Sequence, residues 1–297
     1  MAIEGPTDSA SVAAIAAWKI NAVRLPLNEQ AWRQDTAGYK AAIAAYVTLL
    51  HSYGLYVILD LHWSAPGNYA ATFQQGMADA DHSTNFWANV ALAYKNDPAV
   101  IFDLYNEPHI GPADSAIQDP FGEQAWTAWK SGTTLTKYYP TQASLFDGSA
   151  VSVNWQACGM QAMVNAIRGQ GATQPILLSG LGYASKLGGW LAHKPIDPLN
   201  QLIAGVHVYD NSDHDTQAQV ATVAASVPVI ISELGEYDCS PNYALGWMNW
   251  ADPLGVSYLA WSWYGDNAPC SLVSQVVTDW NGTPTAFGAG FKSHLGA

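Results

Sequence analysis

Short hydrophobic runs of strand length alternate along the chain with longer stretches whose apolar positions recur at helical spacing. Each run ends in polar residues or a turn signal, which is the pattern of a strand buried on both faces. Near-continuous hydrophobicity of this kind favours a parallel sheet. Seven such runs are present, at residues 21–27, 55–63, 100–105, 174–180, 202–209, 227–235 and 255–263.

Helical stretches lie between these runs. Strict alternation of strand and helix predicts an α/β fold, and 297 residues suit a single TIM-type (β/α)8 barrel domain over 1–297. Only residues 109–153 form a long irregular segment, and loops of that length are usually functional. No G-x-G-x-x-G motif follows the first strand, which argues against a nucleotide-binding open sheet. The predicted helices span residues 6–19, 39–53, 83–96, 155–169, 216–226, 242–250 and 286–294.

Two glutamates stand at the ends of the most hydrophobic runs. Glu107 follows VIFDLYN and Glu233 follows VPVIIS, and the chain has only six glutamates. An unpaired carboxylate is costly to bury, so two of them in this setting indicate a function. The carboxyl ends of parallel barrel strands meet at one face, and a pair of carboxyl groups there can cleave a glycosidic bond. The pattern therefore predicts glycoside hydrolysis.

Composition narrows the class of partner. The formal net charge is −13 without a basic patch, so neither nucleic acid nor an anionic membrane is expected to bind. No run of eighteen apolar residues predicts a membrane span. Thirteen Trp and fifteen Tyr favour a neutral polysaccharide, because aromatic rings stack on the apolar faces of sugars. The opening sequence MAIEGPTDSA lacks the charged and apolar regions of a signal peptide, so none is expected here.

The three cysteines fit no metal-binding spacing. Cys239 lies six residues after Glu233, and Cys270 lies seven residues after Trp263. If the two strands are neighbours, these cysteines follow adjacent strand ends, so we expect them to form a disulfide. Cys158 is then left single. A disulfide favours an exported protein.

Taken together, the strand-end motifs resemble those of glycoside hydrolase family 5, the large cellulase and mannanase family of barrel enzymes. The resemblance covers nearly the whole chain from Gly5 onward, and it implies a (β/α)8 barrel that is secreted, needs no cofactor and cleaves β-linked glycans with retention. Its motifs occur in order at the strand ends: VRLPLN (23–28), LDLHW (59–63), Asn-Glu-Pro (106–108), His-Val-Tyr (207–209), SELG (232–235) and AWSW (260–263).

The resemblance also implies a role for individual residues. Glu107 would be the acid/base and Glu233 the nucleophile of a retaining mechanism, with Arg24 beside Glu233 to hold its charge. Asn106 would bond the sugar 2-hydroxyl. The other matches are an acid-positioning His207, Tyr209 near the nucleophile, a substrate-binding His62, a sugar-platform Trp261, and Trp263 on the same strand face as a second platform candidate.

Several activities are compatible with this pattern. An endo-β-1,4-glucanase is favoured; the alternatives within the family are a β-mannanase and a β-1,3- or exo-acting glucanase. A different class is a catalytically impaired barrel that binds carbohydrate without cleaving it. A metal site formed by His62, His207 and Glu233 has only barrel proximity behind it, so no metal is expected.

The family's first strand has no counterpart in this sequence. The chain opens on a helix, and no hydrophobic run precedes Pro6. In the family that strand packs between the strand of Arg24 and the strand of Trp261, so its absence would expose two strand edges. Exposed edges pair readily with another chain, so self-association through them is expected.

Overall fold

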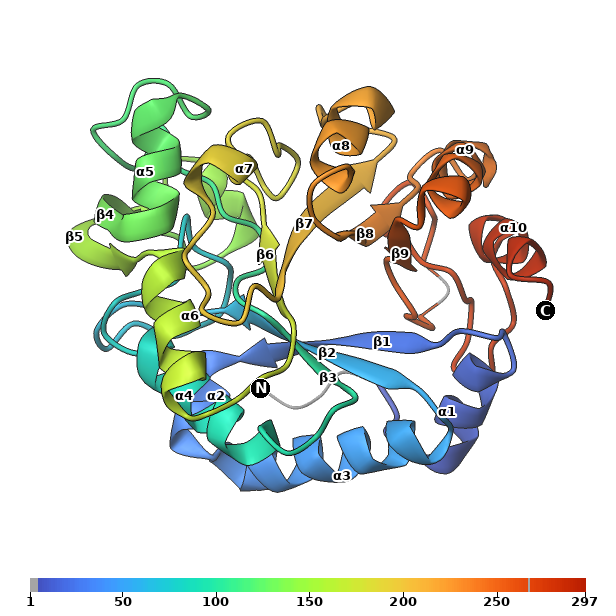
Figure 1. Cartoon of the computed structure of the whole chain (residues 1–297). Coiled ribbons are helices and arrows are strands. Elements are labelled where there is room, and N and C mark those ends of the chain that lie inside the picture. The colour runs from blue at the N-terminus through green and yellow to red at the C-terminus, as the bar shows by residue number, and fades with distance from the viewer. Residues whose placement is uncertain (1–4, 267) are drawn as a thin grey trace.

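A computed structural model describes residues 5–266 and 268–297 as a curled parallel sheet with helices on its outer side (Figure 1). The strands follow one another in the order β1-β2-β3-β6-β7-β8-β9. This confirms the α/β barrel-type fold and the seven strands predicted from the sequence. The strands are β1 (Ala22–Asn28), β2 (Tyr56–Trp63), β3 (Val100–Asp103), β6 (Ile176–Ser179), β7 (Leu202–Tyr209), β8 (Val229–Gly235) and β9 (Ser257–Ala260).

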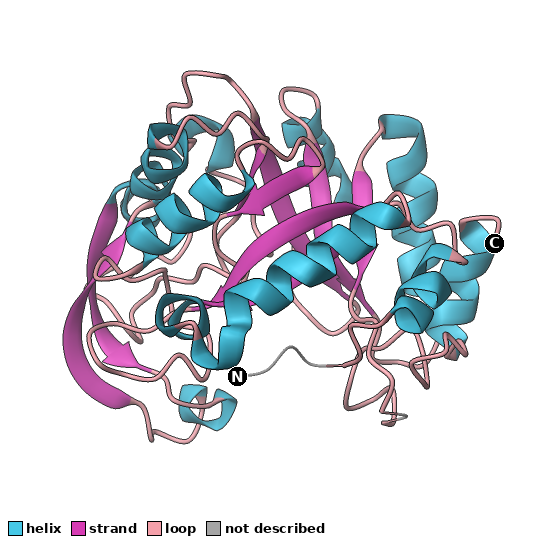
Figure 2. Cartoon of the chain, turned by 90° about the horizontal axis from the view of Figure 1, so that it is seen from below, coloured by secondary structure: helices cyan, strands magenta, loops and turns pink. Residues whose placement is uncertain are grey.

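The long helices cover the convex side of the sheet, as Figure 2 shows for the helices nearest the N-terminus. Local chemistry sets where they begin: Asp8 accepts a hydrogen bond from the Ser11 amide at the start of the first helix, and Thr285 caps the last. The helices on this side are α1 (Ser9–Ala16), α3 (Tyr39–Ser52), α4 (Ser83–Tyr94), α6 (Met160–Gly169), α8 (Gln217–Ala224), α9 (Asn242–Ala251) and α10 (Ala286–His294).

Two hydrophobic clusters hold the sheet. The larger one packs the strands against the helices and includes the fully buried Trp87 and Trp18. The smaller one consists only of residues from strands β2, β6, β7 and β8 and fills the concave side: Ile58, Leu177, Ile203 and Ile230. Parallel register then aligns the carboxyl ends of all these strands at one face, where barrel enzymes carry their sites.

The segment over residues 109–153, expected to be irregular, contains regular structure. Helix α5 (Glu123–Ser131) leads into an antiparallel hairpin of β4 (Gly132–Tyr138) and β5 (Val151–Cys158). The helix predicted over 155–169 was therefore wrong for its first turn, because residues 155–158 pair with β4 and α6 begins only after Gly159. Gly159 is required there, since a Cβ atom would lie 2.2 Å from the Lys130 carbonyl oxygen.

Two further short helices were not predicted, α2 (Glu29–Gln34) and α7 (Trp190–His193). Each has only one or two turns, too short for a helical period to show in the sequence. The last strand is also shorter than expected: it was predicted over 255–263, but β9 ends at Ala260.

The sheet is open between its first and last strands. β1 and β9 are its two edge strands, and a cavity of about 380 Å³ lies between them. Ala22 and Val23 line it from β1, and Tyr258 and Ala260 line it from β9. Figure 1 shows both edges facing this opening. The missing first strand of the sequence pattern thus corresponds to an open side of the barrel.

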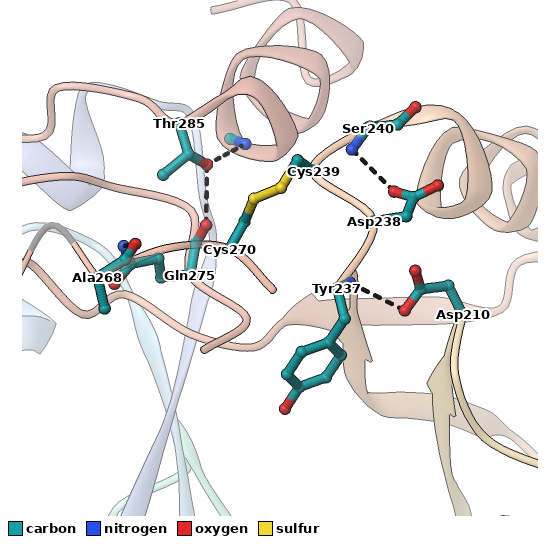
Figure 3. Close-up of a disulfide and its surroundings, with 10 residues drawn as sticks. Asp210, Tyr237, Asp238, Cys239, Ser240, Ala268, Cys270, Gln275 and Thr285 are labelled. Atoms are coloured by element: carbon teal, nitrogen blue, oxygen red, sulfur yellow. Dashed lines mark hydrogen bonds between the residues drawn. A yellow bond between two sulfur atoms is a disulfide. The ribbon is translucent and has the colours of Figure 1, made fainter. Parts of the chain in front are cut away.

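The predicted disulfide joins Cys239 to Cys270, with Cα atoms 5.3 Å apart (Figure 3). It ties the loop after β8 to the loop after β9. Cys158 is a buried free cysteine at the end of β5.

Within the described part of the chain, every helix is too short or too polar to traverse a lipid bilayer.

Candidate active site

Glu107 and Glu233 lie together at the carboxyl ends of the strands, bridged by one histidine. Glu107 follows β3, whose course is extended by the Asn106 amide bonding to Leu61 of β2. Glu233 lies within β8, and the β7–β8 register places His207 opposite it. His207 Nδ1 is 2.9 Å from Glu107 Oε1 and 3.3 Å from Glu233 Oε2. The two carboxylates and the imidazole each bring an atom to within 4.8 Å of the others.

Glu233 is surrounded by donors. Arg24 Nη1 donates to its Oε1 at 2.8 Å, and the Tyr209 hydroxyl donates to its Oε2 at 2.5 Å. Burial and then the charge of Glu233 raise the pKa of Tyr209 well above its ordinary value, so the phenol keeps its proton and serves as a donor. The side chain of Glu233 is 4% exposed. Donors on both oxygens favour a carboxylate that carries its full negative charge.

Glu107 has a less charged setting. Its oxygens contact the Gln74 amide at 2.9 Å and His207, and its side chain is 20% exposed. Burial raises the pKa of Glu107, and the Gln74 hydrogen bond opposes that effect. A raised pKa keeps a carboxyl group protonated at higher pH, which is what a general acid requires.

His207 is neutral. Burial, partly opposed by the charge of Glu233, lowers the pKa of His207 to about 3. Its Nδ1 faces two carboxylates, so the single ring proton belongs there and Nδ1–H donates to them. The imidazole therefore links the two glutamates by hydrogen bonds and adds no net charge between them.

Arg24 is the charged centre beneath both glutamates. Its guanidinium donates to Asp103 Oδ2, Glu233 Oε1 and Asn106 Oδ1, each at 2.8 Å, and lies 3.1 Å from Asp60 Oδ2. Burial alone would lower its pKa, but the three neighbouring carboxylates raise the pKa above the ordinary value. Arg24 thus stays charged and fixes Glu233 and Asn106 in one plane of hydrogen bonds.

Three residues of this network were missed by sequence reasoning. Asp60 and Asp103 are fully buried and adjacent in the β2–β3 register. A usable signal existed, because both carboxylates interrupt otherwise hydrophobic strands. Gln74 comes from the loop after β2 and bridges Glu107 and Asn106, whose Nδ2 donates to it at 2.8 Å. Nothing in the sequence around Gln74 indicated this position.

The predicted aromatic platforms separate in space. His62 and Trp261 stack with ring centroids 5.5 Å apart and planes 3° from parallel, and His62 Nδ1 lies 2.6 Å from Asp60. The Trp261 amide bonds to Leu234, one residue beyond Glu233. Trp263 does not join this group. The chain leaves the strand at Ala260, so the two tryptophans share no strand face, and the Trp263 ring packs 4.9 Å from Trp18 beside the β1–β9 cavity.

A cleft of about 590 Å³ opens beside Glu107. Its wall includes Glu107, His207 and Tyr209, together with His109 and Tyr183, whose rings stack with centroids 4.1 Å apart. The cleft is large enough for sugar rings and presents aromatic faces to them.

The chemistry available here is acid-assisted displacement. Both oxygens of Glu233 accept hydrogen bonds, Glu107 has a raised pKa, and one oxygen of each lies within 4.8 Å of the other. Glu107, His207 and Glu233 are also close enough to share a cation. However, Arg24 already neutralises Glu233 and the His207 Nδ1 carries a proton, so this group is poorly suited to a metal.

Gln74 provides a test of the acid. Its N–H favours the charged form of Glu107, so Gln74→Met should raise the pKa of Glu107 further. Because an acid must be protonated, activity is lost as pH rises through that pKa. We expect the alkaline limb of kcat/KM to move to higher pH. Gln156→Met, at an exposed position of β5, should leave the profile unchanged. An alkaline limb that stays in place or moves to lower pH would contradict this assignment.

Comparisons with known proteins give a consistent result. The family model "Cellulase (glycosyl hydrolase family 5)" matches residues 2–267. Endoglucanase 1 of Saitozyma flava is 28% identical over 212 residues, covering 67% of this chain and 50% of that protein. A mannan endo-1,4-beta-mannosidase of Streptomyces lividans is 21% identical over 286 residues, covering 91% of this chain and 62% of the relative.

A β-glucanase of Saccharophagus degradans, solved with cellotetraose, has a similar fold. Its TM-score is 0.68 at 20% identity, and the match covers 97% of this chain and 82% of that one. The chain spans about half the length of the curated endoglucanases it matches first.

Proposed function

The chain belongs to glycosyl hydrolase family 5, the cellulase family, and we propose that it is an endo-β-1,4-glucanase acting by a retaining two-glutamate mechanism. The observation that supports this most directly is that Glu107 and Glu233 both contact one neutral histidine, His207. An oxygen of Glu107 and an oxygen of Glu233 lie within 4.8 Å of each other. Retaining enzymes hold their carboxyl groups about 5–5.5 Å apart, whereas inverting enzymes need room for a water molecule.

In the first step, Glu233 attacks the anomeric carbon and Glu107 donates its proton to the departing glycosidic oxygen. A covalent glycosyl–enzyme intermediate forms, and Arg24 and Tyr209 hold the attacking carboxylate in place. Asn106 keeps an N–H free beyond the one given to Gln74, and it bonds the sugar 2-hydroxyl. His62 and Trp261 form a stacked pair beside which a sugar ring can lie.

In the second step, Glu107 acts as base. It has given up its proton, and it now removes one from the water that attacks the anomeric carbon and releases Glu233. His207 holds Glu107 in position throughout, because its Nδ1–H bonds to the carboxylate and its low pKa prevents it from taking the proton itself. No cofactor enters this scheme.

Two relatives indicate which polysaccharide is the substrate. Cellotetraose occupies the related β-glucanase, which favours β-1,4-glucan, while the mannosidase relative makes β-mannan the main alternative. Reducing-sugar release from carboxymethylcellulose, glucomannan and laminarin separates β-1,4-glucanase, mannanase and β-1,3-glucanase activity. A rapid fall in carboxymethylcellulose viscosity identifies endo action. Binding to these polysaccharides without any release would instead support a carbohydrate-binding barrel and overturn the proposal.

Retention can be measured separately. Proton NMR of cello-oligosaccharide hydrolysis should show the β-anomer of the product first, with the α-anomer appearing only by mutarotation. Initial release of the α-anomer would exclude the two-step mechanism.

We also propose an extracellular site of action. The disulfide between Cys239 and Cys270 supports this, because such bonds persist in oxidising compartments.

The open side of the barrel gives a further prediction. Among the described residues, no strand pairs with the outer edge of β1 or of β9, so we propose that these edges pair with a second copy of the chain. Size-exclusion chromatography with light scattering should show a mass that rises above that of the 31.8 kDa monomer with concentration. A monomer at every concentration would contradict this prediction.

A further inference from the structure

Away from the catalytic group, three carboxyl side chains converge where β7 and β8 end. Asp210 directly follows β7, and Glu236 and Asp238 follow β8. Each brings an oxygen atom to within 4.8 Å of an oxygen of the other two. Figure 3 shows Asp210 and Asp238 on the same side of the loop that carries Cys239.

The cluster has no protein counter-charge. Among residues 5–266 and 268–297, no Lys, Arg or His forms an ion pair with any of the three carboxylates. Backbone amides satisfy only one oxygen of each: Tyr237 donates to Asp210, Ala244 to Glu236, and Ser240 to Asp238.

Glu236 is the most deeply buried member of the cluster. The residue is 1% exposed, and its Oε2 is buried without a hydrogen-bond partner among the residues that the structure describes. A buried carboxylate oxygen beside two other carboxylates is costly unless a proton or a cation lies against it.

We propose that Asp210, Glu236 and Asp238 bind one calcium ion. All the donors are carboxylate oxygens, which suit Ca²⁺, whereas zinc sites normally include nitrogen or sulfur ligands. Calcium takes about six to eight oxygens. Asp238 is exposed and Asp210 is half-buried, so water can complete the coordination from the solvent side.

Such an ion would join two loops that support the catalytic group without contacting substrate. Tyr237 packs against Tyr209 with ring centroids 5.8 Å apart, and Tyr209 bonds to Glu233. Asp238 directly precedes Cys239, so the ion and the disulfide would hold the same loop. The proposal is for a structural cation and does not depend on which polysaccharide is cleaved.

Terbium(III), which replaces calcium and is excited through nearby tyrosines, provides the first test. Protein treated with EDTA should give saturable terbium luminescence through Tyr237. Calcium should displace the terbium at roughly 10⁻⁴–10⁻³ M, the range of extracellular calcium modules. Added calcium should also raise Tm, because an ion that binds only the folded state stabilises it.

Matched variants assign the site. Asp238→Asn alters an exposed residue that the fold tolerates, and it should weaken calcium binding at least about tenfold. Glu236→Gln should abolish it. Asp213→Asn removes a nearby carboxylate that is 92% exposed, and it should bind calcium like the parent. No saturable luminescence, or equal binding by Asp238→Asn and the parent, overturns the proposal. Neither readout measures hydrolysis, so the outcome is independent of the proposed glucanase activity.

Discussion

Replacing Glu233 by Gln should reduce hydrolysis of every substrate at least about 10³-fold, because an amide cannot form the glycosyl–enzyme bond. The replacement keeps the volume of the side chain. Arg24 can still donate to the amide oxygen, and the Tyr209 hydroxyl oxygen can accept a hydrogen bond from the amide N–H. The protein should therefore fold and still bind cello-oligosaccharides. Steady-state kinetics with cellotetraose measures the loss, and circular dichroism verifies the fold.

Glu107→Gln should behave differently, and the difference identifies the acid. Loss of a general acid costs about 10²–10⁴-fold on a natural glycan, whose leaving group needs a proton. A dinitrophenyl β-cellobioside has a leaving group that departs without one, so formation of the intermediate should be nearly as fast as in the parent. Single-turnover release of dinitrophenol measures this step. If both variants lose activity equally on the activated substrate, or if Glu233→Gln alone keeps it, the two roles are wrongly assigned.

Removing Arg24 should give the largest loss of stability of any single substitution in the site. Arg24→Met leaves Asp60, Asp103 and Glu233 buried without their shared positive charge. Breaking a buried ion pair from one side costs about 3–5 kcal/mol, and here three carboxylates are affected. The free energy of unfolding from urea titration at pH 7 should fall by at least this amount, and activity should fall with it.

Two variants show whether the loss comes from the buried charges. Arg33→Met removes an exposed arginine and should change the free energy of unfolding by less than about 0.5 kcal/mol. Adding Asp103→Asn to Arg24→Met should restore part of the lost stability, because one uncompensated carboxylate is gone. If Arg24→Met unfolds at the same urea concentration as Arg33→Met, the network does not carry the stability assigned to it.

The sequence was most informative about the fold and the site where a hydrophobic strand ends in polar or ionisable residues. Seven strand-like runs, each ending in polar residues, were sufficient to predict the parallel sheet and the face on which Glu107, Glu233, His207 and Arg24 meet. Parallel strands buried on both faces leave few alternatives for register and direction. The disulfide was predictable for the same reason, because its cysteines follow neighbouring strands.

What could not be predicted depends on contacts between distant segments. The β4–β5 hairpin was missed because its strands are half-exposed and polar, and residues 155–158 run directly into the apolar periodicity of α6. Gln74 lies in a loop, and only the folded structure brings it to Glu107. Trp263 was misplaced because the prediction continued β9 for three residues beyond its observed end at Ala260.

The ring closed by the disulfide has a consequence for the order in which the protein can come apart. The cross-link spans a sequence separation of 31 residues, which includes all of α9 and β9. β9 has only four residues and a neighbour on one side alone, so it would otherwise be the easiest strand to detach. With its two ends joined, this portion can leave the sheet only as a closed loop, which gains less conformational freedom than an open chain. Oxidation thus protects the open side of the described sheet, next to the tryptophan that stacks on His62.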